Sequence, residues 1–336
     1  MSAQLLGGPV PRGVDEIVSH LLAVQAQDLR SARLALRARS SGITAEDVDS
    51  ALTVERSLVV AWLGRGTLHL VHRDDYPWLL ALTAPARGAS NSRRLRQEGV
   101  SEAQAERAVS LIQEALAEEG PLTRPELASR MAARKIPTAG QATPHLLMLA
   151  ALRGVSVLGP MKDGVQAFVS TEDWLGKGPI SASNDDRPAM LQQLGRRYLR
   201  GHAPAEAADL AAWSGLGLRD ARSALEGLSM GDAVDSEPSS SSVRLLPSYD
   251  PYLLGWKDRS FMVTDAHKRD LHPGGGVLRA AAIADGEAIG TWSQRRDGDR
   301  VRIEVASFAP LSAEVEELVQ LEALDVARFE GLTLSR

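Results

Sequence analysis

Residues 57–71 read SLVVAWLGRGTLHLV, and this stretch decides the fold predicted for the N-terminal part of the chain. Two runs rich in apolar and β-branched residues flank Gly64-Arg65-Gly66, which is typical of a β-hairpin with a tight turn. Upstream, apolar residues recur at helical spacing over 14–22 and again over 29–36, and Thr44 stands where it can cap a third helix. Three helices followed by a hairpin make a winged helix.

The same order of elements recurs in the next part of the chain. A long helix begins at Ser101, a second helix is capped by Thr123 with Glu126 in the capping-box position, and a third covers 143–152. Residues 155–170, VSVLGPMKDGVQAFVS, then form two predicted strands around a Lys-Asp-Gly turn. The two stretches share the order of their elements and no detectable sequence identity, so the repeat is a structural prediction.

A third copy of this unit has a weaker pattern. Its predicted helices lie within 187–201, 204–213 and 217–228, and a hairpin follows whose turn is the polar stretch from Ser236 to Ser242. The hairpin again closes the unit.

From Pro247 onward the pattern changes to short alternating segments, which predict a small antiparallel sheet or barrel. These segments are SFMVTD (260–265), VLRAAAIAD (277–285), EAIGTWSQ (287–294) and VRIEVASF (301–308). An amphipathic helix over 311–330 is expected to cover one side or one end of the strands.

We therefore expect an α+β protein with three tandem winged-helix modules followed by a C-terminal antiparallel β-barrel. The predicted boundaries are 11–75 for the first module, 76–175 for the second with its leading helices, 185–247 for the third, and 248–336 for the barrel with its closing helix.

Composition narrows the classes of function. The 336 residues carry a formal net charge of −5, which counts against a protein that coats DNA with its whole surface but allows a local basic face. Arginines gather over 30–39 and acidic residues over 314–325, and we interpret both groups as solvated helix faces.

The chain has no cysteine, which excludes disulfides and thiolate metal sites. No apolar run approaches the roughly 20 residues that span a bilayer, so we expect a soluble, cytoplasmic protein.

Three stretches of the chain carry a family resemblance. They are LLAVQAQDLRSARLALRARS (21–40), RGTLHLVHRDDYPWL (65–79), and LLPSYDPYLLGWKDR (245–259) followed by HKR and DGEAIGTW. In this order, and spread over most of the chain, they resemble the AlkZ-like winged-helix DNA glycosylases. The resemblance implies three winged helices and a barrel around a DNA channel, which agrees with the order of elements derived above. It also implies excision of N7-alkylated purines and unhooking of interstrand crosslinks, in general repair or in antibiotic self-resistance. Members of this group carry a Gln-x-Gln motif, whereas a sister group has aspartate at the second position.

In this chain the motif is Gln25-Ala26-Gln27. Residues two apart point to opposite sides of a helix but to the same side of an extended strand, so we expect a non-helical connector with both amides toward DNA. An amide is neither a base nor a nucleophile near neutral pH, so the substrate must already be activated, as a cationic N7-alkylated purine is. We predict that Gln25 and Gln27 position the attacking water and stabilise the sugar cation, with no cofactor and no metal. Without the resemblance, both glutamines would be interpreted as polar surface residues or loop caps.

Contacts to DNA are predicted at Arg65, on the first hairpin turn, and at His267, Lys268 and Arg269 near a barrel hairpin. A bulky adduct does not fit the snug pocket of base-flipping enzymes, so we expect an open groove. The expected partner is double-stranded DNA containing alkylated purines, bound by a monomer. Asp250 is interpreted as a turn residue rather than a DNA contact.

A second class of function is a winged-helix transcription regulator that binds DNA without catalysis. The third helix of the first module, within ITAEDVDSALTVER (43–56), is acidic and therefore poorly suited to the major groove, which favours the enzyme. A degenerate glycosylase that only shields damaged DNA stays open as a third class. His69 and His72, three residues apart at a predicted strand end, do not have the spacing of a convincing metal site.

Overall fold

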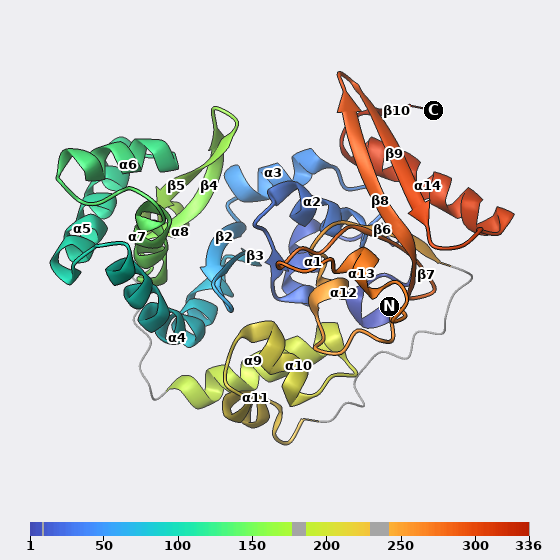
Figure 1. The fold of residues 1–336 in the computed structure, drawn as a ribbon, viewed down its shortest axis with the longest axis horizontal. Coiled ribbons are helices and arrows are strands. Elements are labelled where there is room, and N and C mark those ends of the chain that lie inside the picture. Colours follow the sequence, from blue (N-terminus) through green and yellow to red (C-terminus); the bar gives the residue numbers. More distant parts are fainter. Residues whose placement is uncertain (9, 177–185, 229–241, 336) are drawn as a thin grey trace.

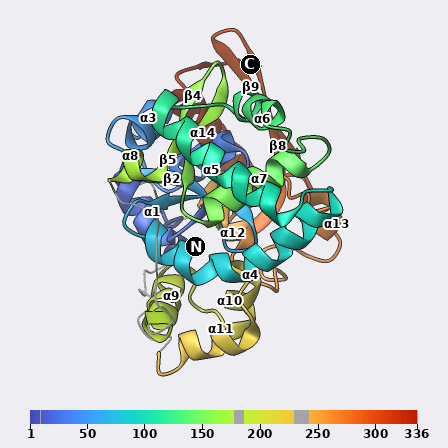
Figure 2. The same ribbon diagram turned by 90° about the vertical axis from the view of Figure 1, so that its left-hand side faces the viewer.

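The computed structural model describes residues 1–8, 10–176, 186–228 and 242–335, and it has a mixed α and β architecture with two sheets. The N-terminal unit lies in the middle of the molecule, and the later parts of the chain are arranged around it (Figure 1). In the view of Figure 2, the helices of the second unit lie in front and those of the third unit lie below them. The central unit is therefore the part against which the others are placed.

The N-terminal unit has the three helices and the hairpin that the sequence predicts. Thr44 caps the third helix, because its hydroxyl accepts the N–H of Asp47 while the Asp47 carboxylate accepts the N–H of Thr44. Gly64 and Gly66 both have positive φ, which lets the hairpin turn tightly without strain. The elements are η1 (Ser2–Gln4), α1 (Val14–Leu21), β1 (Val24–Gln25), α2 (Leu29–Arg37), α3 (Ala45–Thr53), β2 (Leu58–Leu63) and β3 (Thr67–His72).

The second unit also follows its prediction, and it shares a sheet with the first. The predicted capping box at Thr123 with Glu126 is present, and Ser101 at the start of the long helix forms a second one with Gln104. Strand β4 pairs with β2 at Leu158 and Val60, so the two hairpins form one antiparallel sheet of order β1-β3-β2-β4-β5. The elements are α4 (Tyr76–Gln97), α5 (Glu102–Glu119), α6 (Arg124–Ala133), α7 (Ala142–Leu152), β4 (Ser156–Lys162), β5 (Val165–Ser170) and α8 (Thr171–Leu175).

The third unit supplies helices α9 (Arg187–His202), α10 (Ala207–Ser214) and α11 (Leu218–Leu225). Its predicted hairpin turn, Ser236 to Ser242, lies outside the described residues except for Ser242. The strand that we expected to close this unit is β6 (Val243–Leu246), and it pairs with β7 (Ala281–Ala284) of the C-terminal sheet instead.

Helix α9 crosses α11 at close range. A Cβ atom on Gly195 of α9 would overlap the carbonyl oxygen of Ala224, a backbone atom that cannot move aside. Glycine at this position therefore sets how closely the two helices approach.

The C-terminal part holds a second five-stranded sheet, and its described strands do not form the closed antiparallel barrel that we predicted. The order is β10-β9-β8-β7-β6, and β10 runs parallel to β9 while the other pairs are antiparallel. The sheet is not closed at β6 because α14 packs there, and the backbone N–H of Leu245 donates to the Glu322 carboxylate at 3.0 Å. The further elements are α12 (Pro251–Leu254), α13 (Lys268–Leu271), β8 (Glu287–Asp297), β9 (Arg300–Ser307), α14 (Ala313–Phe329) and β10 (Thr333–Leu334).

Residues 260–265, which we predicted as a strand, form turns. The Asp258 carboxylate accepts both the backbone N–H and the hydroxyl of Ser260 at 3.0 Å, and this turns the chain at the start of the segment. Met262 and Val263 are both buried, whereas successive residues of a strand would point to opposite faces. The prediction of a first C-terminal strand is therefore wrong.

The arginine-rich segment and the acidic C-terminal helix pair with each other. The buried Arg37 side chain contacts Glu322 at 3.0 Å and Asp325 at 3.1 Å, and Arg30 contacts Glu330 at 3.1 Å. Our interpretation of these two charged groups as solvated faces is wrong for these residues. They join the central unit to the C-terminal part.

A fully buried ion pair makes a second joint between these parts. Arg39 donates to the two carboxylate oxygens of Asp250 at 2.8 and 2.9 Å, and also to Gln4 Oε1 at 3.0 Å and to the Ala35 carbonyl at 2.7 Å. Asp250 also caps α12 by accepting the N–H of Tyr252, so the predicted turn residue has a second, long-range partner.

Candidate active site

The Gln25-Ala26-Gln27 motif lies on the edge strand of the first sheet. Leu22, with φ of 69°, turns the chain out of α1, and the Asp28 carboxylate then accepts the N–H of Arg30 to begin α2. Between these two points the chain is not helical: Gln25 in β1 pairs with His69, the Ala26 N–H donates to the Leu68 carbonyl at 2.8 Å, and the chain bends at Gln27. This confirms the predicted non-helical connector, in which Ala26 packs into the core.

The two glutamine side chains contact each other. Gln25 Nε2 donates to Gln27 Oε1 over 3.2 Å. The Gln25 residue is only 8% exposed, whereas Gln27 is exposed. The bond leaves the Gln25 carbonyl oxygen, and a second lone pair on the Gln27 oxygen, to accept a hydrogen bond from water or to face a positive charge. This arrangement can orient and stabilise reacting groups, but it cannot take up a proton.

His69 is a buried neighbour of this pair that we considered from the sequence only as a metal ligand. Its Nδ1 atom lies 3.0 Å from the Thr67 carbonyl oxygen, which can only accept, so Nδ1 carries the proton. Burial, opposed by the bond to Thr67 and helped by the nearby Arg65 charge, lowers the pKa of His69 to about 4. The imidazole is therefore uncharged near pH 7.

The four predicted DNA contacts have different surroundings. Arg65 is exposed, and its Nη1 atom donates to the Ala212 carbonyl at 3.3 Å, so the hairpin turn is tied to the end of α10. The His267 ring stacks on Phe308 with 4.1 Å between ring centroids. The remaining two, Lys268 and Arg269, are exposed on α13, and neither forms an ion pair within the described part of the chain.

A further basic group near Arg65 has no signal in the sequence. Arg259 Nη1 donates to His272 Nε2 at 2.6 Å. Burial lowers the pKa of Arg259, and the charge of Arg65 adds to this effect, which places the two guanidinium groups near each other. The pKa of His272 is lowered by burial and then by the charges of Arg259 and Lys268. Residues from the first hairpin and from the C-terminal part thus contribute to one basic region.

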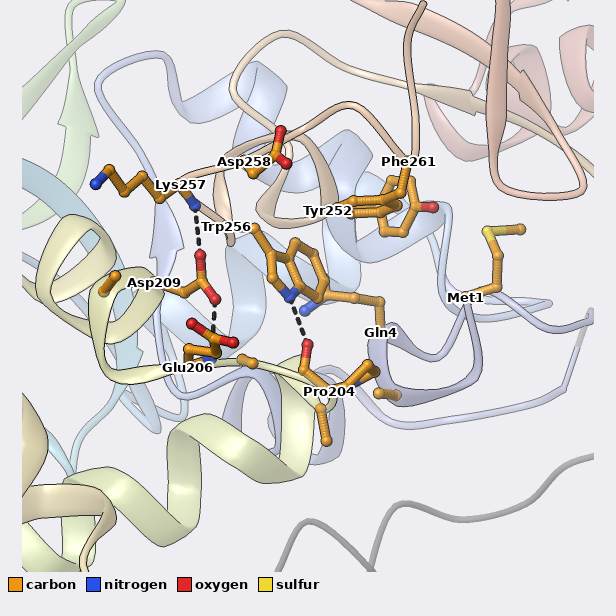
Figure 3. Close-up of a pocket in the computed structure, with 14 residues that line it drawn as sticks. Met1, Gln4, Pro204, Glu206, Asp209, Tyr252, Trp256, Lys257, Asp258 and Phe261 are labelled. Atoms are coloured by element: carbon orange, nitrogen blue, oxygen red, sulfur yellow. Dashed lines mark hydrogen bonds between the residues drawn. The ribbon is translucent and has the colours of Figure 1, made fainter.

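A pocket of about 940 Å³ lies apart from the glutamine pair, and neither Gln25 nor Gln27 lines it (Figure 3). Its wall includes the Trp256 indole, which donates to the Pro204 carbonyl at 3.0 Å, and Asp209, which accepts the N–H of Lys257 at 2.9 Å. These polar atoms of the pocket wall are therefore already hydrogen-bonded within the protein.

Within the described ranges, no group of three or more His, Asp or Glu side chains is placed to hold a metal ion. None of the helices seen in those ranges combines the length and the apolar character needed to cross a membrane.

Comparisons with known proteins agree with this architecture. The model of the AlkZ-like DNA glycosylase family matches residues 18–329. An interstrand DNA cross-link repair glycosylase from Streptomyces sahachiroi is 24% identical over 363 residues, which cover 99% of this chain and 95% of that protein. The solved structure of the S. sahachiroi DNA glycosylase AlkZ has 22% sequence identity and a TM-score of 0.79, covering 100% of this chain and 96% of that one. These matches do not favour the alternative of a transcription regulator. The chain belongs to the AlkZ-like family of DNA glycosylases.

Proposed function

We propose that this protein is a monofunctional glycosylase that hydrolyses the N-glycosidic bond of N7-alkylated, cationic purines in double-stranded DNA. Gln25 and Gln27 are its catalytic pair. The observation that carries the proposal is the 3.2 Å hydrogen bond between the amide of Gln25, at the end of edge strand β1, and the amide of Gln27, which follows the strand. Family membership supplies the class of reaction, and the chemistry of the amides restricts the substrate.

The substrate restriction follows from what an amide can do. When the glycosidic bond of an N7-alkylated purine breaks, its electron pair goes to the purine and cancels the positive charge, so no acid is needed to protonate the leaving group. The sugar carbon becomes cationic, and water adds to it and then loses a proton to solvent. The carbonyl oxygens of Gln25 and Gln27 orient this water and face the sugar cation. Neither Thr67 nor His69, which adjoin the pair, is an amine that could form a Schiff base, which supports hydrolysis without a lyase step.

We extend the proposal to bulky adducts and interstrand crosslinks, in DNA repair or in self-resistance to a genotoxic antibiotic. Two observations support this extension: the crosslink-repair name of the S. sahachiroi relative, and the exposure of Gln27, which is accessible from solvent. A normal base, which would leave as an anion, is not expected to be a substrate.

The proposed DNA-binding mode uses the basic groups near the first hairpin and on α13. Lys268 and Arg269 contact phosphates, with Arg65 and His267 beside them. The order of three helices and a hairpin supports winged-helix modules in the first two units. We propose that a monomer acts in the cytoplasm on duplex DNA.

Base release tests the proposal directly. Duplexes containing 7-methylguanine, and duplexes crosslinked by a nitrogen mustard, are incubated with the native protein and with Gln25→Ala and Gln27→Ala. Each variant is expected to excise on the order of 100- to 1,000-fold more slowly, as when one preorganised dipole is removed from an active site. The matched control is Gln166→Ala in β5, the outer strand of the second hairpin.

The control is expected to match the native rate, and all variants are expected to bind the duplex with native affinity. Excision by both motif variants at the native rate would remove the glutamines from the mechanism. An inactive native protein on every cationic purine lesion would refute the proposed reaction.

A further inference from the structure

His69 lies directly opposite Gln25, the first motif glutamine, in the first sheet. Gln25 in β1 lies opposite His69 in β3, and His69 in turn lies opposite Ala61 in β2. Directly opposed residues of antiparallel strands share a face, with Cβ atoms about 4.5–5.5 Å apart. Gln27 follows the end of β1 and accepts a hydrogen bond from Gln25. The two glutamines and His69 therefore form one polar group at the edge of this sheet.

Other parts of the chain enclose the His69 ring on the side that faces away from β3. It lines a small cavity of about 20 Å³ together with Gly64, Trp213 and Ser214. A Cβ atom on Gly64 would lie 3.7 Å from His69 Cε1 and 3.2 Å from the Ser214 carbonyl oxygen, so the hairpin turn and the end of α10 close around the ring. The ring is therefore a fixed neighbour of Gln25 rather than a mobile surface side chain.

The hydrogen bonds of His69 leave one nitrogen for the glutamine pair. Nδ1 donates to the Thr67 carbonyl at 3.0 Å, whereas Nε2 has only the Thr67 hydroxyl at 3.5 Å, the outer limit of a hydrogen bond. Nε2 therefore keeps a lone pair that can accept an N–H or a water. Arg65 is the charged group that acts on this ring, and it adds to burial in keeping the ring uncharged.

We propose that His69 is a positioning residue for the catalytic pair, an inference that rests on the proposed function. Its fixed imidazole restricts the Gln25 side chain to the rotamer that donates to Gln27, so that both carbonyl oxygens face the reacting sugar. The neutral state of the ring is part of this role, because an imidazolium beside the site would repel the sugar cation.

The first test is single-turnover release of 7-methylguanine from duplex DNA by His69→Phe and His69→Asn. His69→Phe keeps the ring shape and removes both nitrogens, and its rate constant is expected to fall on the order of 100-fold, as small misplacements of catalytic groups do. His69→Asn keeps an N–H toward the Thr67 carbonyl and is expected to recover about 10-fold of that loss. The matched control, His72→Phe, changes a histidine of the same strand that pairs with Leu58 at its far end, and is expected to keep the native rate.

The second test is a double-mutant cycle with Gln25→Ala. Because His69 acts through Gln25, His69→Phe is expected to cause no further loss in the Gln25→Ala background, with the dissociation constant for lesion DNA unchanged. Rate losses that multiply in the double variant, or a native rate in His69→Phe, would overturn the inference. If thermal unfolding shows that His69→Phe is not folded, His69→Asn takes its place in the cycle.

These outcomes separate this inference from the proposed function. Native excision by Gln25→Ala and Gln27→Ala rejects the glutamine mechanism itself. Loss of excision in both glutamine variants together with a native rate in His69→Phe rejects only the positioning role of His69.

Discussion

The buried pair of Arg39 and Asp250 allows a quantitative test of how the parts of this molecule are held together. Both side chains are 0% exposed, and the two bonds between them are 2.8 and 2.9 Å long. Arg39→Met removes the charge while keeping a long apolar stem in the same space. Asp250 would then stay in the interior as an unpaired carboxylate, with the N–H of Tyr252 as a hydrogen-bond donor to it.

The size of the effect follows from these contacts. Removing one partner of a buried pair destabilises a protein by about 3–5 kcal/mol. We therefore expect the free energy of unfolding to fall by about 4 kcal/mol, and the melting temperature to fall by roughly 8–16 °C at 2–4 °C per kcal/mol. Arg33→Met, in α2 shortly before Arg39, is the matched control, because Arg33 pairs with Asp49 in a partly exposed bridge, for which about 0–1 kcal/mol is expected.

The assay is urea and thermal unfolding at pH 7.5, followed by circular dichroism. Arg39→Met combined with Asp250→Leu is expected to be more stable than Arg39→Met alone, because no charge is then left unpaired in the interior. An Arg39→Met variant whose free energy of unfolding falls by less than about 1 kcal/mol, the value expected for an exposed pair, would refute the reasoning. A double variant less stable than Arg39→Met alone would also refute it.

Three further predictions concern other parts of the molecule. Burial lowers the pKa of His202 to about 3, so the ring stays neutral in the folded state. The unfolded chain binds a proton at this histidine below about pH 6.5, so the free energy of unfolding is highest above that pH and is about 2 kcal/mol lower at pH 5. His202→Phe should make the loss of stability between pH 7.5 and 5 smaller by about this amount in urea unfolding curves, with His69 contributing a loss of its own, and an unchanged loss would contradict the assignment. Gly195→Ala should lower stability by about 1–3 kcal/mol through overlap with α11, whereas Gly88→Ala, with open space around it in α4, should be neutral or stabilising in the same thermal assay. Lys268→Ala and Arg269→Ala should each reduce the slope of log K against log salt for duplex binding by about 1, measured by fluorescence anisotropy; native slopes would show that α13 does not touch phosphates.

Local signals in the sequence predicted much of the first two units. The N-cap at Thr44, the capping box at Thr123 and the glycine turn at residues 64–66 each depend on a few neighbouring residues, and the structure confirms all three. The non-helical form of the Gln25-Ala26-Gln27 segment was also predictable, because a helix would point the two glutamines to opposite sides.

What the sequence could not predict depends on contacts between distant residues. The pairing of β6 with β7 and the 211-residue separation between Arg39 and Asp250 have no local signal. The proposed role of His69 was missed for the same reason: its burial requires the end of α10 to close over the first hairpin, and Gln25 is set opposite it only by the pairing of β1 with β3. The alternation of residues 260–265 was misleading because a side-chain turn at Asp258 overrode it.

The unequal burial of the two motif glutamines bears on how the proposed active site can change during evolution. A carboxylate at position 27 would keep most of its hydration, because the side chain there is exposed and the paired part of β1 ends at Gln25. A carboxylate at position 25, 8% exposed, would be taken out of water beside apolar neighbours, with a large penalty for folding. The outer position is therefore free to exchange an amide for an acid. A lineage with this scaffold can acquire a general base in one substitution while the inner glutamine and the sheet stay as they are.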